Sequence, residues 1–467
     1  MKARLAFPFL CALNCFLMGQ APKPPTAAEL KAFQETKAKA EQGNATAQTS
    51  LGVMYANGLG VAKDVKEAAN WFSLAANQGH ADGQANLGYM YEYGLGVAKD
   101  EKDAVNWYNK AAVQGNTAAQ FNLGIRYAGG LGVAKDDVGA MKWFFLAANQ
   151  GHVDAAVSVG VMYEKGRGVV QNDVEAAKWY YLAASRYGRA IAQFNLGNMY
   201  LAGRGVPKNN AEAAKWYRKA ADQGYADAQN EFGNVCYYGS DYGENMPRDK
   251  VAAVKWYFLA ARQGHAGAQN NLGIMYERGQ GVPENAAEAV KWFSLAIRQG
   301  HADAQFNLGY MYSEGQGVPK DAAEALKWYR RAAVLKPKWA GTLGVFYEVG
   351  RCGVPKDDVE SLKWTRLAAE QGDFKGMRRL SDRYGTGLGV PNNDMEAVKW
   401  FLAANSQLGM RSPDADCKWS TLSPIYDVPD SHSVDLFALI DALTPQQYAE
   451  CQRWAREWKP KEPPEAK

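Results

Sequence analysis

Residues 300–334 read GHADAQFNLGYMYSEGQGVPKDAAEALKWYRRAAV, and the chain is built from close copies of this unit. The copies run from about Gly43 to Ala404, and a Trp near the end of each copy marks its position. These residues are Trp71, Trp107, Trp143, Trp179, Trp216, Trp256, Trp292, Trp328, Trp364 and Trp400. Successive Trp residues are 36 positions apart, except for one interval of 37 and one of 40. Ten copies at a nearly fixed period predict one repeat array instead of several separate domains.

Each copy predicts two helices joined by a glycine-rich turn. In the copy quoted above, Leu308 and Met311 belong to an apolar series at helical spacing, which Gly315 ends. Asp321 resembles the N-cap of a second helix, which carries Trp328. Each predicted helix is short, so its stability should come from contacts between neighbouring copies.

The sizes of the side chains indicate how the copies pack. Gly309 and Ala302 are small enough for a neighbouring helix to approach closely, whereas Trp328 and Tyr312 are large enough to fill the space between layers. The same alternation of small and large residues recurs in the other copies, so one packing scheme should serve the whole array.

This pattern resembles the Sel-one-like repeat (SLR) family, relatives of the tetratricopeptide repeat. The resemblance rests on three motifs: A-x-A-Q-x-x-L-G-x-M-Y at 302–312, G-x-G-V at 315–318 and A-x-x-W-Y-x-x-A-A at 325–333. It covers about 360 residues and implies an all-α fold: a right-handed α/α superhelical solenoid of about ten 36-residue helix-turn-helix repeats with terminal capping helices. It also implies a scaffold, an adaptor, or a protein that contacts a host or a cell envelope.

Further segments are predicted on either side of the array. Residues 1–21 read as a signal peptide, because Lys2 and Arg4 precede the apolar run Leu5–Met18. Residues 22–42 read as a linker and an N-terminal capping helix, and residues 43–405 as the ten repeats. Residues 406–458 form a C-terminal extension with capping helices, and residues 459–467 a disordered tail. We therefore expect an exported protein, periplasmic or extracellular, with no membrane span after signal removal.

Two copies depart from the regular length. One extra residue follows the fourth copy, near Ser185–Gly188, and the sixth copy contains about four extra residues within Tyr237–Pro247. Insertions in a solenoid map to loops on one face, which is often the binding face. Tyr238, Asp241 and Tyr242 are therefore candidate contacts. The alternative is that the insertion is a neutral extension of the loop.

Charge and cysteine content narrow the possible partners. The net charge is +4 over 467 residues with acids and bases mixed, which gives no indication of nucleic-acid binding. Cys417 and Cys451 lie on either side of the predicted C-terminal cap and would form a disulfide if the chain is exported. The alternative is two isolated thiols.

The sequence contains no recognisable catalytic, cofactor-binding or metal-binding motif. It lacks G-x-S-x-G, H-E-x-x-H, C-x-x-C and a Walker loop. Four histidines share the start of a first helix, too far apart for a shared zinc ion, and so indicate turn and packing roles. They are His80, His152, His265 and His301. We predict no catalytic residue, no metal and no cofactor.

A row of polar residues remains on each first helix after the packing positions have been assigned. It occupies the position before the Leu of each copy and the position two after it. The candidate partner-binding residues are Asn86, Tyr89, Asn122, Asn195, Asn198, Asn271, Asn307 and Tyr310. In tetratricopeptide domains such Asn residues hold the backbone of a ligand, and the resemblance implies a similar use on the concave side here. The alternative is that these Asn side chains bond between adjacent helices and stiffen the stack.

These observations predict a non-catalytic scaffold or adaptor that binds a protein or an extended peptide segment. A second possibility is a scaffold associated with peptidoglycan or another envelope polysaccharide, since Tyr89 and Tyr310 would suit sugar stacking. A third is an enzyme that binds or hydrolyses β-lactams, as described for cysteine-rich relatives. Those relatives carry regular Cys pairs, which this chain lacks.

Overall fold

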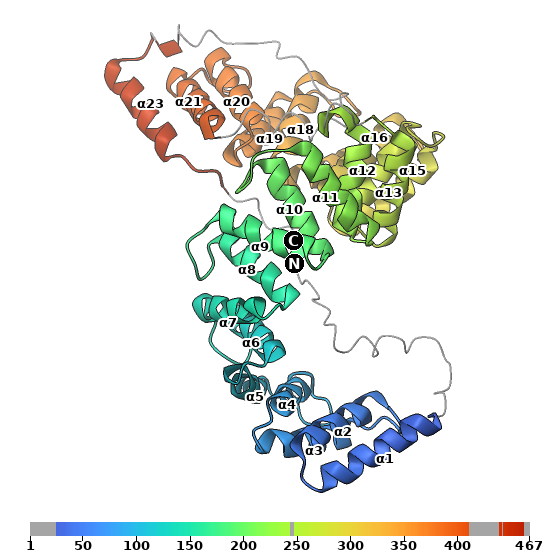
Figure 1. Ribbon diagram of the computed structural model, residues 1–467. Helices are drawn as coiled ribbons and strands as arrows, with labels where there is room; N and C mark the ends of the chain where they lie inside the picture. The colour runs from blue at the N-terminus through green and yellow to red at the C-terminus, as the bar shows by residue number, and fades with distance from the viewer. Residues whose placement is uncertain (1–24, 243–246, 411–438, 441, 462–467) are drawn as a thin grey trace. The chain divides into compact units, whose positions relative to one another are not determined.

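A computed structural model describes residues 25–242, 247–410, 439–440 and 442–461. Within these residues every regular element is a helix, and each helix packs on the next one over residues 27–202 and again over residues 226–457 (Figure 1). The prediction of an all-α solenoid of 36-residue repeats is therefore confirmed. The chain divides into two compact units, Met1–Ala220 and Ala221–Lys467, which are treated separately below.

Each repeat supplies a first helix and a second helix. The first helices are α2 (Ala45–Asn57), α4 (Ala81–Tyr93), α6 (Thr117–Gly129), α8 (Val153–Lys165), α10 (Ala190–Ala202), α12 (Ala226–Tyr238), α14 (Ala266–Glu277), α16 (Ala302–Glu314), α18 (Pro337–Val349) and α20 (Phe374–Thr386). The second helices are α3 (Val65–Asn77), α5 (Glu101–Val113), α7 (Asp137–Asn149), α9 (Asp173–Ser185), α11 (Asn210–Asp222), α13 (Lys250–Arg262), α15 (Ala286–Ile297), α17 (Ala322–Leu335), α19 (Asp358–Glu370) and α21 (Asp394–Met410). Helices α1 (Ala27–Glu41) and α23 (Pro445–Glu457) lie outside the repeats.

The turn between the two helices has the geometry that its sequence predicts. Gly315 ends α16 in the left-handed region at φ 72°, which glycine adopts without strain. Gly317 also has positive φ, and a Cβ there would lie 2.5 Å from the carbonyl oxygen of Ala286 in the preceding repeat. The Asp321 carboxylate accepts hydrogen bonds from the backbone of Ala323 and Glu324, so the predicted N-cap of α17 is confirmed.

In the first eight repeats an aromatic ring of the second helix packs directly on a glycine of the first helix. Tyr329, the residue after the marker Trp328, is fully buried, and a Cβ added to Gly309 on α16 would lie 2.8 Å from two of its ring carbons. Trp328 is only half-buried and packs with Tyr312 against the core of the preceding repeat, as expected from their size. The sequence thus marks the repeat by its Trp, whereas the deepest side chain is the residue that follows the Trp.

Buried glutamines link consecutive repeats. In the second unit, the side-chain amide of Gln269 donates to the carbonyl of Ala261 at 3.2 Å, and its Oε1 accepts from Gln299 at 3.0 Å. In the first unit, Gln84 bonds in the same way to Ala76 and Gln114. Each pair satisfies a buried side-chain amide and fixes the end of one second helix to the first helix before it.

This glutamine pairing fails where the repeats become irregular. Leu335 stands where the donor to Gln305 would be, and Gln305 Oε1 is buried with no hydrogen-bond partner among the described residues. Gly341 stands at the position of the buried glutamine in the next repeat. The amide of Gln371 is therefore left with neither its nitrogen nor its oxygen bonded within the described part of the chain.

Replacing Gly341 by Gln should therefore stabilise the second unit. A Cβ at Gly341 meets nothing closer than 3.3 Å, so the new side chain fits, and its amide can reach Gln371 as Gln269 reaches Gln299. Removing a helical glycine contributes about 1 kcal/mol and a neutral hydrogen bond about 1 kcal/mol. The expected rise in the free energy of unfolding, measured by denaturant titration, is about 1–2 kcal/mol. Gly341→Ala is the control, because it gains only the helix contribution; equal gains from the two variants would argue against the glutamine pairing.

The helices outside the repeats cover the two ends of the array. Thr26 forms a capping box with Glu29 at the start of α1, which packs on α2. At the other end α23 packs on α21, where Trp400, Trp454 and Trp458 form a cluster of rings. Thr444 and Gln447 form a capping box at the start of α23. The predicted signal peptide, residues 411–438 of the C-terminal extension and the last six residues of the predicted tail lie outside the described residues.

Candidate functional site

The candidate partner-binding residues lie at equivalent positions on the first helices. Nearly all of them are half-buried, and Asn307 is buried with 8 % exposure. The candidate residues of the first unit lie on α4, α6 and α10, and those of the second unit on α14 and α16. What separates them is whether each side chain already has a hydrogen-bond partner inside the protein.

Asn86 on α4 and Asn122 on α6 differ from the other candidate asparagines in their hydrogen bonding. Neither side chain hydrogen-bonds to any other residue that the structure describes, although both are half-buried. Beside Asn86, the rings of Tyr89 and Tyr93 lie 4.6 Å apart at 41°. Burial, and then the nearby Glu92 carboxylate, raise the pKa of Tyr89, so its hydroxyl stays protonated at neutral pH. This part of the surface offers two amides and a ring pair.

Asn195 and Asn198 on α10 face tyrosine hydroxyls of the first unit. Asn198 Oδ1 accepts a hydrogen bond of 2.7 Å from the buried Tyr217, and Asn195 lies within hydrogen-bond reach of Tyr180. These two side chains therefore hold second-helix rings in place. Because both side chains already bond to tyrosine hydroxyls, only their remaining donors and acceptors are available to a partner.

In the second unit the Asn side chains bond from repeat to repeat. Asn271 on α14 donates to Asn230 on α12 at 3.1 Å, and Asn307 on α16 donates to Asn270 at 3.0 Å. Glu231, beside Asn230, accepts from Asn230 and from Asn234 at 3.0 Å each. Burial raises the pKa of Glu231. Asn271 and Asn307 thus have the bridging role that the sequence left open as the alternative.

The remaining sequence candidates occupy more varied surroundings. Tyr310 is half-buried, and burial followed by Glu314 raises the pKa of its hydroxyl. In the sixth-repeat insertion Tyr238 is half-buried and Asp241 is exposed, whereas Tyr242 is buried at 3 % exposure. The ring of Tyr242 therefore faces the protein and not solvent. Residues 243–246 of this insertion lie outside the described residues.

The predicted disulfide involves one described cysteine. Cys451 on α23 is fully buried, and its thiol donates to the carbonyl of Met395 at 3.5 Å. Burial raises the pKa of this thiol. Cys417 lies outside the described residues, so the pairing stays a prediction.

Ion pairs on the first helices are a feature that the sequence reasoning missed. The Arg126 guanidinium pairs with the Glu92 carboxylate, and both side chains are nearly buried. Glu92 also accepts a hydrogen bond of 2.7 Å from Tyr108. Arg383 and Glu348 form the corresponding pair in the second unit at 3.0 Å. The available signal was that both arginines occupy a position where six of the ten copies have Met.

The shared histidines are N-caps. Nδ1 of His80, His152, His265 and His301 each accepts a hydrogen bond from the backbone amide three residues further on, at 3.0–3.3 Å. An accepting nitrogen is unprotonated, so each cap requires a neutral ring. Burial lowers the pKa of His152, which stacks on Phe121 at 4.3 Å, and burial likewise lowers the pKa of His301 beside Asp303 and Lys336.

We expect the caps at His152 and His301, whose pKa values burial lowers, to make stability fall in mild acid. As the pH drops below the ordinary histidine value of about 6.5, the unfolded chain takes up protons before the folded chain does. The stabilisation that the caps contribute should therefore be fully present above pH 7 and should decrease toward pH 5. In the variant His152→Asn with His301→Asn, about 1 kcal/mol per cap should no longer depend on pH, because asparagine caps without titrating. Thermal melts at both pH values measure this, and an unchanged pH dependence in the variant would contradict the capping role.

Within the described residues, no group of three or more His, Cys, Asp and Glu side chains is placed to hold a metal ion. In the same residues no helix combines the length and the apolar character that crossing a bilayer requires. Half-buried amides, tyrosine rings and ion pairs make up the candidate surface, and such groups suit hydrogen bonding and ring contacts.

Comparison with known protein families gives one match, which recurs along the chain. The Sel1 repeat model matches ten times, at residues 45–80, 81–116, 117–152, 153–187, 190–225, 226–265, 266–301, 302–333, 343–373 and 375–407. No curated protein gives a match.

Two solved structures share the repeat. A Sel1 repeat protein from Oxalobacter formigenes is 32 % identical with a TM-score of 0.51, over 68 % of this chain and 92 % of that one. The protein c5321, a protective antigen of uropathogenic Escherichia coli strains with an SLR fold, is 31 % identical with a TM-score of 0.49. That match covers 91 % of this chain and 94 % of the other. With ten matched repeats and the repeat geometry described above, this chain belongs to the Sel1-repeat family.

Proposed function

We propose that the protein is an exported, non-catalytic scaffold that binds an extended segment of a partner protein. The binding surface is the concave face formed by the first helices, centred in the first unit on Asn86, Tyr89 and Asn122. Export rests on the apolar run near the N-terminus. Recovery of the chain outside the cytoplasm, with its first residue between positions 20 and 23, tests that part.

The observation that carries the proposal is the difference between two sets of asparagines. Asn271 and Asn307 donate to neighbouring asparagines, whereas Asn86 and Asn122 have no such bond within the described residues. An amide held on a half-buried surface without a partner is available to a ligand, and its carbonyl and NH₂ match the two hydrogen-bonding groups of an extended backbone. Two such amides on successive first helices can hold successive parts of one segment.

The test uses a partner isolated by crosslinking from the native cell envelope. The variant Asn86→Ala with Asn122→Ala should lower the affinity for that partner by about 1–3 kcal/mol, because the bound backbone groups lose their hydrogen bonds. Its melting temperature should be unchanged, since the two amides bond to no other residue in the part of the chain that the structure describes. Calorimetry and a thermal melt of the same sample measure the two quantities.

The matched control is Asn271→Ala with Asn307→Ala. Because these side chains bridge α12, α14 and α16, this variant should melt at a lower temperature. Unchanged partner affinity in the Asn86 and Asn122 variant would refute the proposed surface. Loss of melting temperature in that variant would assign the two residues a structural role instead.

A further inference from the structure

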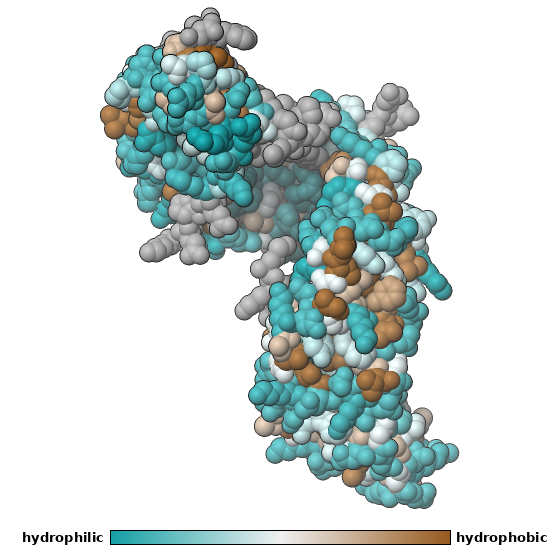
Figure 2. Space-filling model, turned by 90° about the vertical axis from the view of Figure 1, so that its left-hand side faces the viewer, coloured by the Kyte–Doolittle hydropathy of each residue, from teal (hydrophilic) through white to brown (hydrophobic). Residues whose placement is uncertain are grey.

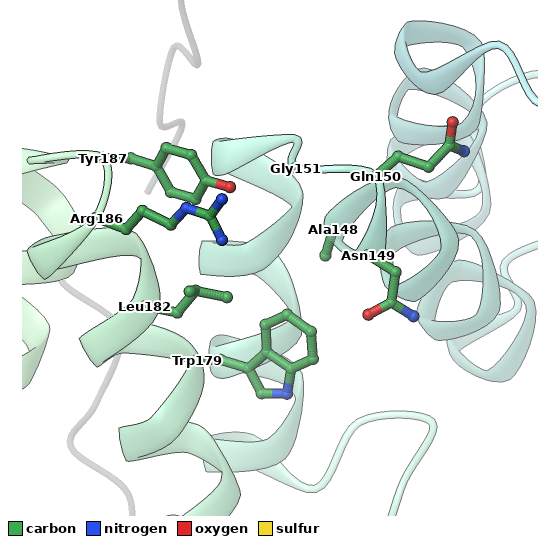
Figure 3. Close-up of a pocket in the computed structure, with 8 residues that line it drawn as sticks. All are labelled: Ala148, Asn149, Gln150, Gly151, Trp179, Leu182, Arg186 and Tyr187. Atoms are coloured by element: carbon green, nitrogen blue, oxygen red, sulfur yellow. The ribbon is translucent and has the colours of Figure 1, made fainter.

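A cavity of about 330 Å³ lies in the first unit between the ends of two successive second helices (Figure 3). Trp179, Leu182, Arg186 and Tyr187 reach toward it from α9 and the residues after it. Facing them is the end of α7 with the turn that follows, which includes Asn149. The cavity is separate from the first-helix surface discussed above, because both of its walls come from second helices and their C-terminal turns.

The cavity arises where the fourth repeat departs from the others. In regular repeats the residue equivalent to Arg186 is a glutamine bonded to the glutamine of its own first helix, as Gln150 is to Gln120 at 2.7 Å. In the fourth repeat Ala156 replaces the acceptor and Arg186 replaces the donor, so both members of the pair are absent together. Arg186 therefore takes no part in a buried glutamine pair, and its side chain is exposed.

The extra residue of this repeat extends the wall that α9 forms. The link after α9 is one residue longer than usual and brings Tyr187 over the turn at Gly151. A Cβ on Gly151 would lie 3.3 Å from the Tyr187 hydroxyl oxygen, so the bare backbone there leaves room for that hydroxyl. The guanidinium carbon of Arg186 lies 5.6 Å from the centre of the Tyr187 ring. Positive charge and an aromatic hydroxyl therefore lie at one edge of the cavity.

Trp179 supplies an apolar wall whose position is fixed. Its indole meets the ring of Phe145 on α7 edge to face, with ring centres 5.7 Å apart. Leu182 extends the apolar surface one helical turn further along α9. On the face of the molecule that Figure 2 shows, hydrophobic residues form small patches separated by hydrophilic residues. The indole of Trp179 differs from these patches because it borders a hollow that has polar groups opposite.

Three polar groups around the cavity have hydrogen-bonding capacity to spare. Across the described ranges, the amide of Asn149, the guanidinium of Arg186 and the hydroxyl of Tyr187 form no hydrogen bond or ion pair with another residue. The arginine is a planar donor that matches a carboxylate with two parallel hydrogen bonds. An amide and a phenol both donate and accept, as recognition of a sugar hydroxyl requires.

We propose that this cavity binds an acidic saccharide, a pyranose ring that carries a carboxylate. The ring lies against the indole of Trp179, its carboxylate pairs with Arg186, and its hydroxyls bond to Asn149 and Tyr187. The volume is at the lower end of the range for small-molecule sites, which suits a short saccharide. An acidic peptide could also pair with Arg186, but carboxylate side chains offer no hydroxylated ring with a C–H face to use the indole, the amide and the phenol together.

The experiment measures binding to the full chain by calorimetry. The probes are a disaccharide containing glucuronic acid, the same disaccharide with its carboxylate converted to the methyl ester, and a short peptide of glutamate and glycine. The acidic disaccharide should bind saturably, and its methyl ester should bind on the order of tenfold more weakly, the loss expected when a charge-assisted pair is removed. The peptide should not compete.

Two variants locate the site. Arg186→Gln restores the residue that other repeats carry, so the fold should be kept, and affinity for the acidic disaccharide should fall by on the order of tenfold while the methyl ester is unaffected. Asn86→Ala with Asn122→Ala should bind the disaccharide as the unmodified chain does, which separates this site from the protein-binding surface. Absence of saturable saccharide binding, equal binding by Arg186→Gln, or binding of the peptide alone would each overturn the proposal.

Discussion

Replacing Gly309 by Val is expected to destabilise the second unit by roughly 3 kcal/mol or more, the upper range for overpacking a well-filled core. The Cβ of any new side chain would lie 2.8 Å from Cδ1 and Cε1 of Tyr329. That ring cannot move aside, because Tyr329 is fully buried between Phe306 and Phe346, with ring centres 4.8 and 5.3 Å away. The backbone must shift instead, since the carbonyl of Ala325 is also only 3.1 Å from the new atom.

Denaturant titration and hydrogen exchange together measure this effect. Because each repeat contacts mainly its neighbours, the loss of protection should be concentrated in α16 and α17 and should be smaller further away. Gly341→Ala is the control, since this helical glycine faces no ring and the substitution should stabilise. A Gly309→Val protein as stable as the unmodified chain would show that the glycine and ring contact does not limit the packing of the repeat.

Most of the fold could be predicted from the sequence because one pattern of packing residues recurs, with small changes, in ten copies. The turn at Gly315, the N-cap at Asp321 and the close approach at Gly309 each depend on local geometry or on side-chain size, and the period fixes their register. The depth of each side chain was harder to predict. Trp328 is the larger side chain, yet Tyr329 lies deeper, because the helix turns the second of two adjacent residues inward.

Interactions between different repeats were less predictable. A Gln such as Gln305 gives no sign in sequence that its oxygen depends on a donor 30 positions later, where Leu335 stands. The same limitation applies to the candidate binding row. Asn86 and Asn271 occupy equivalent positions, but only the second has an asparagine on a neighbouring helix to bond with. Equivalent positions thus have different roles because the side chain that each one faces differs.

The Arg126–Glu92 pair is the second place where one substitution should have a large effect. Glu92→Ser is expected to destabilise the first unit by about 3–5 kcal/mol, because the buried Arg126 guanidinium loses its counter-charge. Arg126 Nε is already buried without a partner among the described residues, so no other group compensates for the loss. The hydroxyl of Tyr108 would keep only a weaker acceptor.

The double variant Glu92→Ser with Arg126→Met should recover most of that loss. Serine stands at the Glu92 position in the eighth repeat, where Ser313 lies 3.3 Å from the hydroxyl of Tyr329, and Met stands at the Arg126 position in six copies. Each replacement residue therefore already occurs at its position in another copy of the array, and the double variant has no buried charge. Replacing a buried ion pair by apolar packing is often neutral or stabilising, whereas removing one partner is not. A double-mutant cycle by denaturant titration measures the coupling between the two residues. Strictly additive effects, with the double variant at least as unstable as Glu92→Ser, would show that the two charges act independently.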